Sequence, residues 1–266
     1  MKIVDIHTHT FPPSVAAKAI SKLEGTSSTK AIGSGLEDDL LVSMQESGVD
    51  ISVVAPVATS PNCHSINLKS IASREKNGES LYFLGALHPN TPNIREEIAF
   101  LKENGFNGVK LHPDYQDFFV DEQRMFPIYE ELEKQEMFLL LHCGEDVSFV
   151  NSGKGNPSRT AKILKQFPEL KIIAAHLGGY LRWDETLEHL GEYENVWLDT
   201  AYCAFKPEQQ TMLKIINTFT SKKILLGSDW PWMEQKKSID YIKSLPISEE
   251  QKSDILGDNA LRVFIK

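Results

Sequence analysis

Short apolar runs recur along the chain, and each is followed by a polar loop and then by a segment whose apolar residues have helical spacing. Several runs lack strict alternation of apolar and polar residues, which is typical of parallel strands buried on both faces. Strands are therefore predicted at Ile3–Ile6, Ile51–Ala55, Leu81–Ala86, Gly108–Leu111, Phe138–Leu141, Ile172–Ala175, Val196–Leu198 and Ile224–Leu226. This α/β rhythm predicts a single (β/α)8 barrel, or TIM barrel, with a doubly wound open sheet as the competing architecture.

The segments between these runs predict helices and one long loop. Helices are expected at Leu36–Glu46, Asn93–Asn104, Gln123–Gln135, Ser158–Phe167 and Lys236–Ser244, and a final helix near the C-terminus. The stretch 10–35 directly follows the first strand and is rich in Pro, Gly, Ser and Thr, so we expect a long irregular loop that could cover a site. No linker or repeat divides the chain, which predicts one domain over residues 1–266.

Composition and charge narrow the function. The chain is 41% hydrophobic and 24% charged, which is ordinary for a globular protein, and its formal net charge is −9. An acidic chain has no general attraction for nucleic acid or anionic membranes, so a small-molecule partner is expected. Cys63, Cys143 and Cys203 are widely spaced and form neither a disulfide framework nor a cysteine zinc motif. Without an export signal or a long apolar stretch, the sequence predicts a cytoplasmic protein.

Histidines flank the end of the first predicted strand. His7 and His9 stand two residues apart in His-Thr-His, and residues at this spacing on a strand project from the same face. Both imidazoles can therefore reach one cation. A His-x-His pair alone is weak support for a metal site, because surface or packing histidines are more common.

Three further polar residues stand at predicted strand ends. His142 follows Phe-Leu-Leu-Leu, His176 follows Ile-Ile-Ala-Ala, and Asp229 follows Ile-Leu-Leu-Gly-Ser. Any one of them could simply cap a helix. In a barrel, however, the carboxyl ends of all strands converge on one mouth, where catalytic residues from different strands meet. Together with the two N-terminal histidines they predict a metal site at that mouth.

These motifs resemble the amidohydrolase superfamily. The segments that carry the resemblance are Asp-Ile-His-Thr-His at 5–9, Gly-Val-Lys-Leu-His-Pro at 108–113, Ala-His-Leu-Gly-Gly at 175–179, Gly-Ser-Asp-Trp-Pro at 227–231 and Ile-Leu-Gly-Asp-Asn-Ala-Leu-Arg-Val-Phe at 255–264. They are most similar to its amidohydrolase-related branch, which includes aminocarboxymuconate-semialdehyde decarboxylase, benzoate-type decarboxylases, hydrolases and lactonases. The resemblance covers nearly the whole chain and does not specify the substrate.

The resemblance implies that His7, His9, His142 and Asp229 bind one divalent metal ion, with His176 beside it. Three imidazoles and a carboxylate suit Zn²⁺, and Mn²⁺ is the alternative. Such an ion can lower the pKa of a bound water to about 7. Asp229 would then take a proton from that water while His176 stabilises developing charge or shuttles protons.

Two reactions fit these residues. The first is hydrolysis of a C–N or C–O bond in a small, carboxylated substrate, and the alternative is non-oxidative decarboxylation of a small unsaturated or aromatic carboxylic acid. The motifs are shared by both. A non-catalytic barrel that keeps the metal as a structural element is disfavoured by the complete ligand set and by His176.

Neighbouring residues are expected to contact the substrate. Lys110 and His112 lie two apart on the fourth strand, and Trp230 follows Asp229, so all three are predicted to contact it. A carbamylated Lys110 bridging a second metal ion is the alternative role. One ion is favoured over two, since the closest resemblance is to single-metal enzymes.

Basic residues near the predicted mouth suggest an anionic substrate. Lys154, Arg159 and Arg182 follow the fifth and sixth strands and could hold a carboxylate, although solvated loop cations are an equal reading. The resemblance also implies a homodimer.

Overall fold

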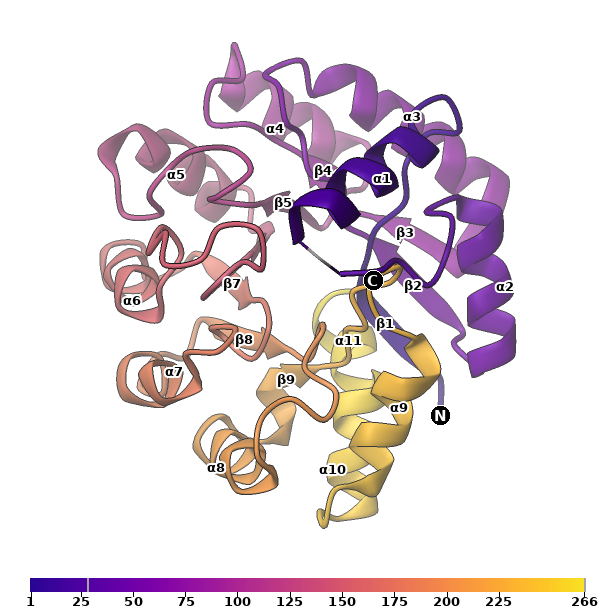
Figure 1. The fold of residues 1–266 in the computed structure, drawn as a ribbon. Helices are drawn as coiled ribbons and strands as arrows, with labels where there is room; N and C mark the ends of the chain where they lie inside the picture. Colours follow the sequence, from indigo (N-terminus) through magenta and orange to yellow (C-terminus); the bar gives the residue numbers. More distant parts are fainter. Residues whose placement is uncertain (28, 266) are drawn as a thin grey trace.

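The computed structural model describes residues 1–27 and 29–265, so Ser28, in the loop predicted over 10–35, and Lys266 lie outside the described residues. Parallel strands form the centre of the molecule and helices surround them (Figure 1). The strands are β1 (Val4–Thr8), β2 (Ile51–Val54), β3 (Leu81–Phe83), β4 (Gly85–Ala86), β5 (Gly108–Leu111), β6 (Phe138–Leu141), β7 (Lys171–Ala174), β8 (Val196–Asp199) and β9 (Ile224–Leu225). All of their pairings are parallel and follow chain order.

Backbone hydrogen bonds close the ring of strands. The predicted strand 81–86 is divided into β3 and β4, and at the break the Leu84 N–H donates to the Val54 carbonyl at 2.9 Å. At the other junction, the Ile6 N–H donates to the Leu226 carbonyl at 2.9 Å. The chain is therefore a (β/α)8 barrel and not an open sheet, as the alternation of elements predicts.

The helices follow the strands around the outside of the barrel (Figure 1). Their bounds are α1 (Ala16–Ser27), α2 (Glu37–Ser47), α3 (His64–Asn77), α4 (Ile94–Glu103), α5 (Phe126–Lys134), α6 (Pro157–Gln166), α7 (Trp183–His189), α8 (Gln209–Phe219), α9 (Gln235–Ser244), α10 (Glu249–Ser253) and α11 (Asn259–Val263). Shorter turns are η1 (Gly78–Ser80), η2 (Gln123–Met125), η3 (Ser221–Lys223) and the π-helical η4 (Asp254–Asp258). Among the described residues, no helix combines the length and apolar character that crossing a membrane requires.

Two predicted features differ from the structure. The stretch 10–35 is not wholly irregular, because it contains the twelve-residue helix α1. Only Ala16 of α1 is buried, so this helix contributes little to the core, although its apolar residues recur at helical spacing from Ala16 to Leu23. The expected C-terminal helix is present but is divided among α10, η4 and α11.

Alternate strand residues build two separate cores. Leu139 and Leu141 of β6 pack outward in the large cluster beneath the helices. Leu140, between them, points into the barrel and packs with residues such as Ile173 of β7 and Phe264 near the C-terminus. Because side chains on a strand alternate between its two faces, apolar residues at every position are what a strand covered on both sides requires.

Truncation of the inner core is expected to destabilise the barrel strongly. Leu140 is 0% exposed, so Leu140→Ala leaves a cavity and should lower the free energy of unfolding by about 2–5 kcal/mol. Leu68→Ala is the matched control, because Leu68 is 50% exposed and its loss should cost less than about 0.5 kcal/mol. Urea unfolding followed by circular dichroism measures both, and equal midpoints would contradict this assignment of the core.

Candidate metal centre

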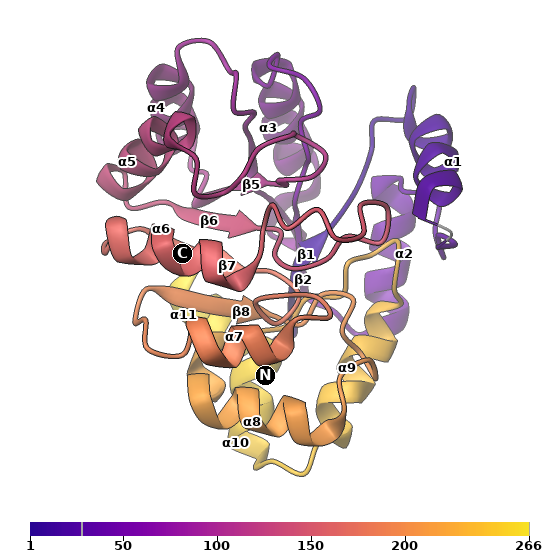
Figure 2. The same ribbon diagram turned by 60° about the vertical axis from the view of Figure 1, so that its left-hand side comes forward.

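The polar residues predicted at strand ends gather at one end of the barrel. Figure 2 shows that the strands point toward the side where α1 and the longer loops lie. A cavity of about 890 Å³ opens there. The sequence-predicted residues that line it are His7, His9, Lys110, His112, His142, His176 and Asp229.

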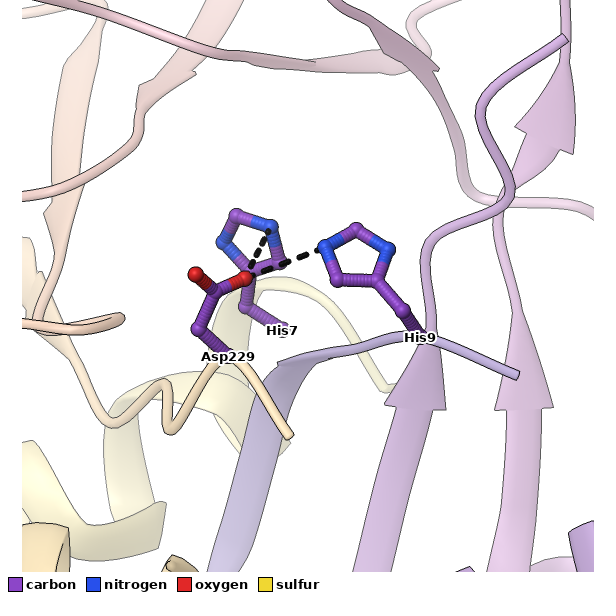
Figure 3. A group of neighbouring side chains, drawn as sticks. All are labelled: His7, His9 and Asp229. Atoms are coloured by element: carbon purple, nitrogen blue, oxygen red, sulfur yellow. Dashed lines mark hydrogen bonds and ion pairs between the residues drawn. The ribbon is translucent and has the colours of Figure 1, made fainter. Parts of the chain in front are cut away.

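Two histidines and an aspartate in the lining of this cavity form a compact cluster (Figure 3). The His9 Nε2 lies 3.1 Å from Asp229 Oδ1, and the His7 Nε2 lies 3.6 Å from the same oxygen. The His7 side chain is 1% exposed, whereas those of His9 and Asp229 are 15% and 13% exposed. One nitrogen from each histidine and one carboxylate oxygen all lie within 4.8 Å of one another.

Hydrogen bonds fix the orientation of both rings. The Nδ1 of His7 lies 2.8 Å from Asp199 Oδ2, and the Nδ1 of His9 lies 2.8 Å from the Ala55 carbonyl. Both partners only accept hydrogen bonds, since we take Asp199 as a carboxylate, so each Nδ1 must carry the proton. Each neutral ring then presents an unprotonated Nε2 toward the cluster, which is the tautomer that metal-ligating histidines use.

This orientation favours a cation within the cluster. In the neutral tautomer, the His9 Nε2 and the Asp229 Oδ1 are both acceptors, and at 3.1 Å they repel one another unless a proton or a metal ion lies between them. Burial alone would raise the pKa of Asp229, but the neighbouring imidazoles of His9 and His7 hold the pKa of this carboxyl below its ordinary value, so it is ionised. The donor set of two imidazoles and an ionised carboxylate therefore fits a divalent transition metal.

His142 and His176 form a chain of hydrogen bonds beside this cluster. The His176 Nδ1 lies 2.8 Å from the Ala201 carbonyl, and its Nε2 lies 3.0 Å from the Nδ1 of His142. The protons assigned by this chain leave the buried Nε2 of His142 without a proton, and it has no hydrogen-bond partner in the described part of the chain. An unpaired buried acceptor costs stability, so this nitrogen is available to an ion.

His142 lies nearer to a second group of residues than to the first. A ligand atom of His142 is within 4.8 Å of one from His112 and one from Asp146. Its ring also stacks on that of His112, with centroids 3.9 Å apart. The structure thus brings His7, His9 and Asp229 together, and places the fourth predicted ligand next to them and not within the same 4.8 Å group.

Lys110 is packed against the cluster of His7, His9 and Asp229. Its side chain is 1% exposed, and its Nζ lies 3.1 Å from the Nε2 of His7. Burial lowers the pKa of Lys110 to about 8, although the charges of Asp199 and Asp229 act in the opposite direction. At neutral pH its ammonium group can therefore give up a proton more easily than that of an exposed lysine.

One predicted substrate contact lies elsewhere. Trp230 is 1% exposed and packs in the outer core against the loop containing Gly33, where an added Cβ would lie 2.6 Å from the Trp230 ring. The cavity is lined instead by Trp232. The reason is that the Trp230 carbonyl accepts a hydrogen bond from the His9 N–H, which fixes it in a bridge beside β1 with its side chain directed away from that of Asp229.

The three cations near the mouth are already paired with carboxylates. Lys154 lies 2.5 Å from Asp117, and Arg159 lies 2.5 Å from Asp121. Arg182 contacts both Glu145 and Glu185. These pairs make the three side chains poor candidates for holding a substrate carboxylate.

Both candidate proton-transfer residues have unusual backbone conformations. His176 has a φ of 59° and Asp229 has a φ of 71°, which lie in the left-handed region. Such a conformation costs about 1–3 kcal/mol for a residue other than glycine, and it recurs at active sites. At His176 it is supported by a 2.8 Å hydrogen bond from its N–H to Asp199 Oδ1.

Asp199 is the main site residue that the sequence analysis missed. It is 0% exposed, and its two oxygens accept from His7 and from the backbone of His176. Burial raises its pKa, while His176 and Lys110 counteract this effect. Its position directly after Val-Trp-Leu at the end of β8 was the available signal.

The chain is similar to a known protein family over nearly its whole length. Residues 4–265 match the model of the family described as Amidohydrolase. A curated relative, 2-amino-3-carboxymuconate-6-semialdehyde decarboxylase of Dictyostelium discoideum, is 23% identical over 210 residues, which cover 64% of this chain and 56% of that protein. The chain therefore matches little more than half the length of this relative.

Solved structures share the whole fold. An uncharacterized TIM-barrel protein from Bordetella bronchiseptica is 17% identical with a TM-score of 0.81, covering 99% of this chain and 98% of that one. A dihydroxybenzoic acid decarboxylase from Polaromonas sp. JS666, with bound manganese and the inhibitor 2-nitroresorcinol, is 17% identical with a TM-score of 0.74, covering 99% and 96%. At this identity the structural likeness establishes the fold alone.

Proposed function

Since this chain belongs to the amidohydrolase family, we propose that it is a metal-dependent enzyme that decarboxylates a small aromatic or unsaturated carboxylic acid without oxidation. The observation that carries the proposal is the compact cluster of His7, His9 and Asp229 in the lining of a large cavity. The decarboxylases among the relatives and structural neighbours favour this reaction over hydrolysis. We propose that residues 1–266 act as one catalytic domain.

We propose that His7, His9, Asp229 and His142 hold one divalent ion. Its chemistry would be that of a Lewis acid, which polarises substrate oxygen atoms and offsets their negative charge. The imidazole-rich set suits Zn²⁺, whereas the Polaromonas decarboxylase binds manganese. Lys110, next to the cluster, is proposed to neutralise the substrate carboxylate, together with His112 at the cavity wall.

The chain must supply one proton for this reaction. The bond between the substrate carbon and its carboxylate breaks, carbon dioxide leaves, and the electron pair on carbon takes up a proton, so that no water is consumed. Asp229 suits this role because, within the described residues, its Oδ2 has no hydrogen-bond partner and its side chain lines the cavity. Both nitrogens of His176 are engaged, so His176 is proposed to orient His142 and to stabilise charge.

Isotopic labelling distinguishes decarboxylation from hydrolysis, the reaction that the sequence alone favoured. We expect the manganese-loaded enzyme to release labelled carbon dioxide from 2,6-dihydroxybenzoate carrying ¹³C in its carboxyl group. The product should contain one deuterium on the ring carbon when the reaction runs in deuterium oxide. Incorporation of ¹⁸O from water into the cleavage product of an amide or lactone, without carbon dioxide release from any acid tested, would establish hydrolysis instead.

The carboxylate behind His7 is expected to tune metal affinity. Asp199→Asn keeps the size of the side chain but weakens its hold on the His7 Nδ1–H, so metal affinity should fall about 10- to 100-fold. Titration with a competing chelator measures this change. Asp184→Asn, at an exposed position in α7, is the control. Equal affinity in both variants would show that Asp199 does not support the ligand.

A further inference from the structure

The cavity is much larger than the metal cluster requires. Its volume of about 890 Å³ approaches the upper end of the roughly 300–1,000 Å³ typical of pockets for drug-sized ligands. A dihydroxybenzoate is far smaller than such a ligand. The space beyond the cluster extends between α1 and the side of the barrel formed by β2, β3 and α3.

One wall of this extension comes from the segment around α1. Figure 2 shows α1 standing at the mouth, apart from the ring of helices that cover the barrel. Val15, just before this helix, and Leu23 within it line the cavity. Val15 is 44% exposed, and α1 buries only Ala16. These apolar side chains therefore face the cavity without being covered by protein.

The opposite wall is apolar and well packed. Val54 at the end of β2 and Phe83 at the end of β3 are 1% and 7% exposed, and both line the cavity together with Ile66 of α3. Lys69 is the cation on this wall. It is exposed, so its ammonium group can stay in water. The two walls together would enclose an uncharged group between them.

The approach to the cavity is apolar as well. Of the eleven large apolar side chains that are exposed in the described residues, eight lie on the connections that follow barrel strands. They include Val15, Phe149, Leu181 and Phe205. Exposed apolar side chains gathered at one end of a molecule commonly mark a ligand or partner site.

We infer that the substrate carries an apolar arm, which lies between Leu23 of α1 and the wall formed by Val54, Ile66 and Phe83. This inference rests on the proposed function, because it takes the carboxylate end of the substrate to lie at the metal cluster. The substrate class is thus an acid with an extended hydrocarbon group. A second carboxylate held by Lys69 is the competing arrangement.

A series of unbranched acids tests the arm directly. Calorimetric titration of the manganese-loaded protein with butanoate, hexanoate and octanoate should give affinities that rise by about threefold per buried methylene. Octanoate, with four more methylenes, should then bind about 80-fold more tightly than butanoate, and more tightly than octanedioate. Equal binding of butanoate and octanoate, or tighter binding of octanedioate, would overturn the inference.

Matched variants locate the arm in the protein. Leu23→Asp should lower octanoate affinity about tenfold and leave butanoate unchanged, whereas Ala17→Asp, at an exposed position on the same helix, should change neither. Ile66→Trp fills the opposite wall and should act in the same way, with Leu68→Trp as its control. If a control variant lowered octanoate affinity as much as the variant to which it is matched, the arm would not lie between these two walls.

The proposed reaction and the apolar arm can each be refuted without refuting the other. These titrations need no turnover, so chain-length discrimination without carbon dioxide release from any acid would overturn only the proposed reaction. Carbon dioxide release from dihydroxybenzoate without any chain-length discrimination would overturn only the apolar arm.

Discussion

Replacing Asp229 by asparagine is expected to lower turnover at least about 10³-fold, the largest effect of any single change proposed for this chain. Asp229 Oδ1 lies closest to the Nε2 atoms of His7 and His9, and its Oδ2 is proposed to carry the reacting proton. The amide is a poorer ligand and cannot donate an acidic proton at this position. Carbon dioxide release, with metal content determined on the same sample, measures the result.

Asp38→Asn is the matched control for this prediction. Its side chain is 85% exposed on α2 and pairs only with Lys76, so turnover and metal content should both stay unchanged. A fall in turnover confined to Asp229→Asn supports its role at the centre. Retention of both metal and full turnover in Asp229→Asn would remove Asp229 from the proposed chemistry.

The second large effect is expected at His176. His176→Asn should lower turnover about 10²- to 10⁴-fold while the protein keeps most of its metal, because His176 is proposed to act beside the ion and not as its ligand. Asparagine can still accept the hydrogen bond from the Nδ1 of His142. The loss should therefore appear in kcat rather than in metal affinity, and pre-steady-state release of carbon dioxide reports it.

His189→Asn serves as the control for His176. His189 lies in the last turn of α7, outside the cavity lining, and its replacement should leave kcat unchanged. Unchanged kcat in His176→Asn, with metal bound, would favour a barrel in which this histidine has only a structural role.

The barrel could be predicted from sequence because its strands are short apolar runs of regular spacing. The predicted bounds of the strand Phe138–Leu141 match the observed ones, because a strand buried on both faces contains no polar residue. The helix α1 was missed for the opposite reason. With only Ala16 buried, α1 lies between a cavity and solvent, and its apolar residues stand within a stretch rich in Pro, Gly, Ser and Thr that is typical of a loop.

Only the site residues that stand at the ends of strands could be predicted from the sequence. His7, His9 and Asp229 could be brought together in advance, because the carboxyl ends of barrel strands converge. The ion pairs of Lys154 with Asp117 and of Arg182 with Glu145 could not be predicted, because the two partners of each pair lie 37 residues apart along the chain. Trp230 lies outside the cavity lining for a similar reason, since its carbonyl is bonded to the distant His9 N–H and its ring packs in the outer core.

We propose above all that one divalent ion is bound by side chains from both ends of the chain and from its middle. Crystals of the manganese-loaded protein, with anomalous diffraction recorded near the manganese absorption edge, test this directly. We expect one anomalous peak in contact with His7, His9, His142 and Asp229. A peak held by other residues, or full decarboxylase activity in crystals without any peak at this cluster, would contradict it.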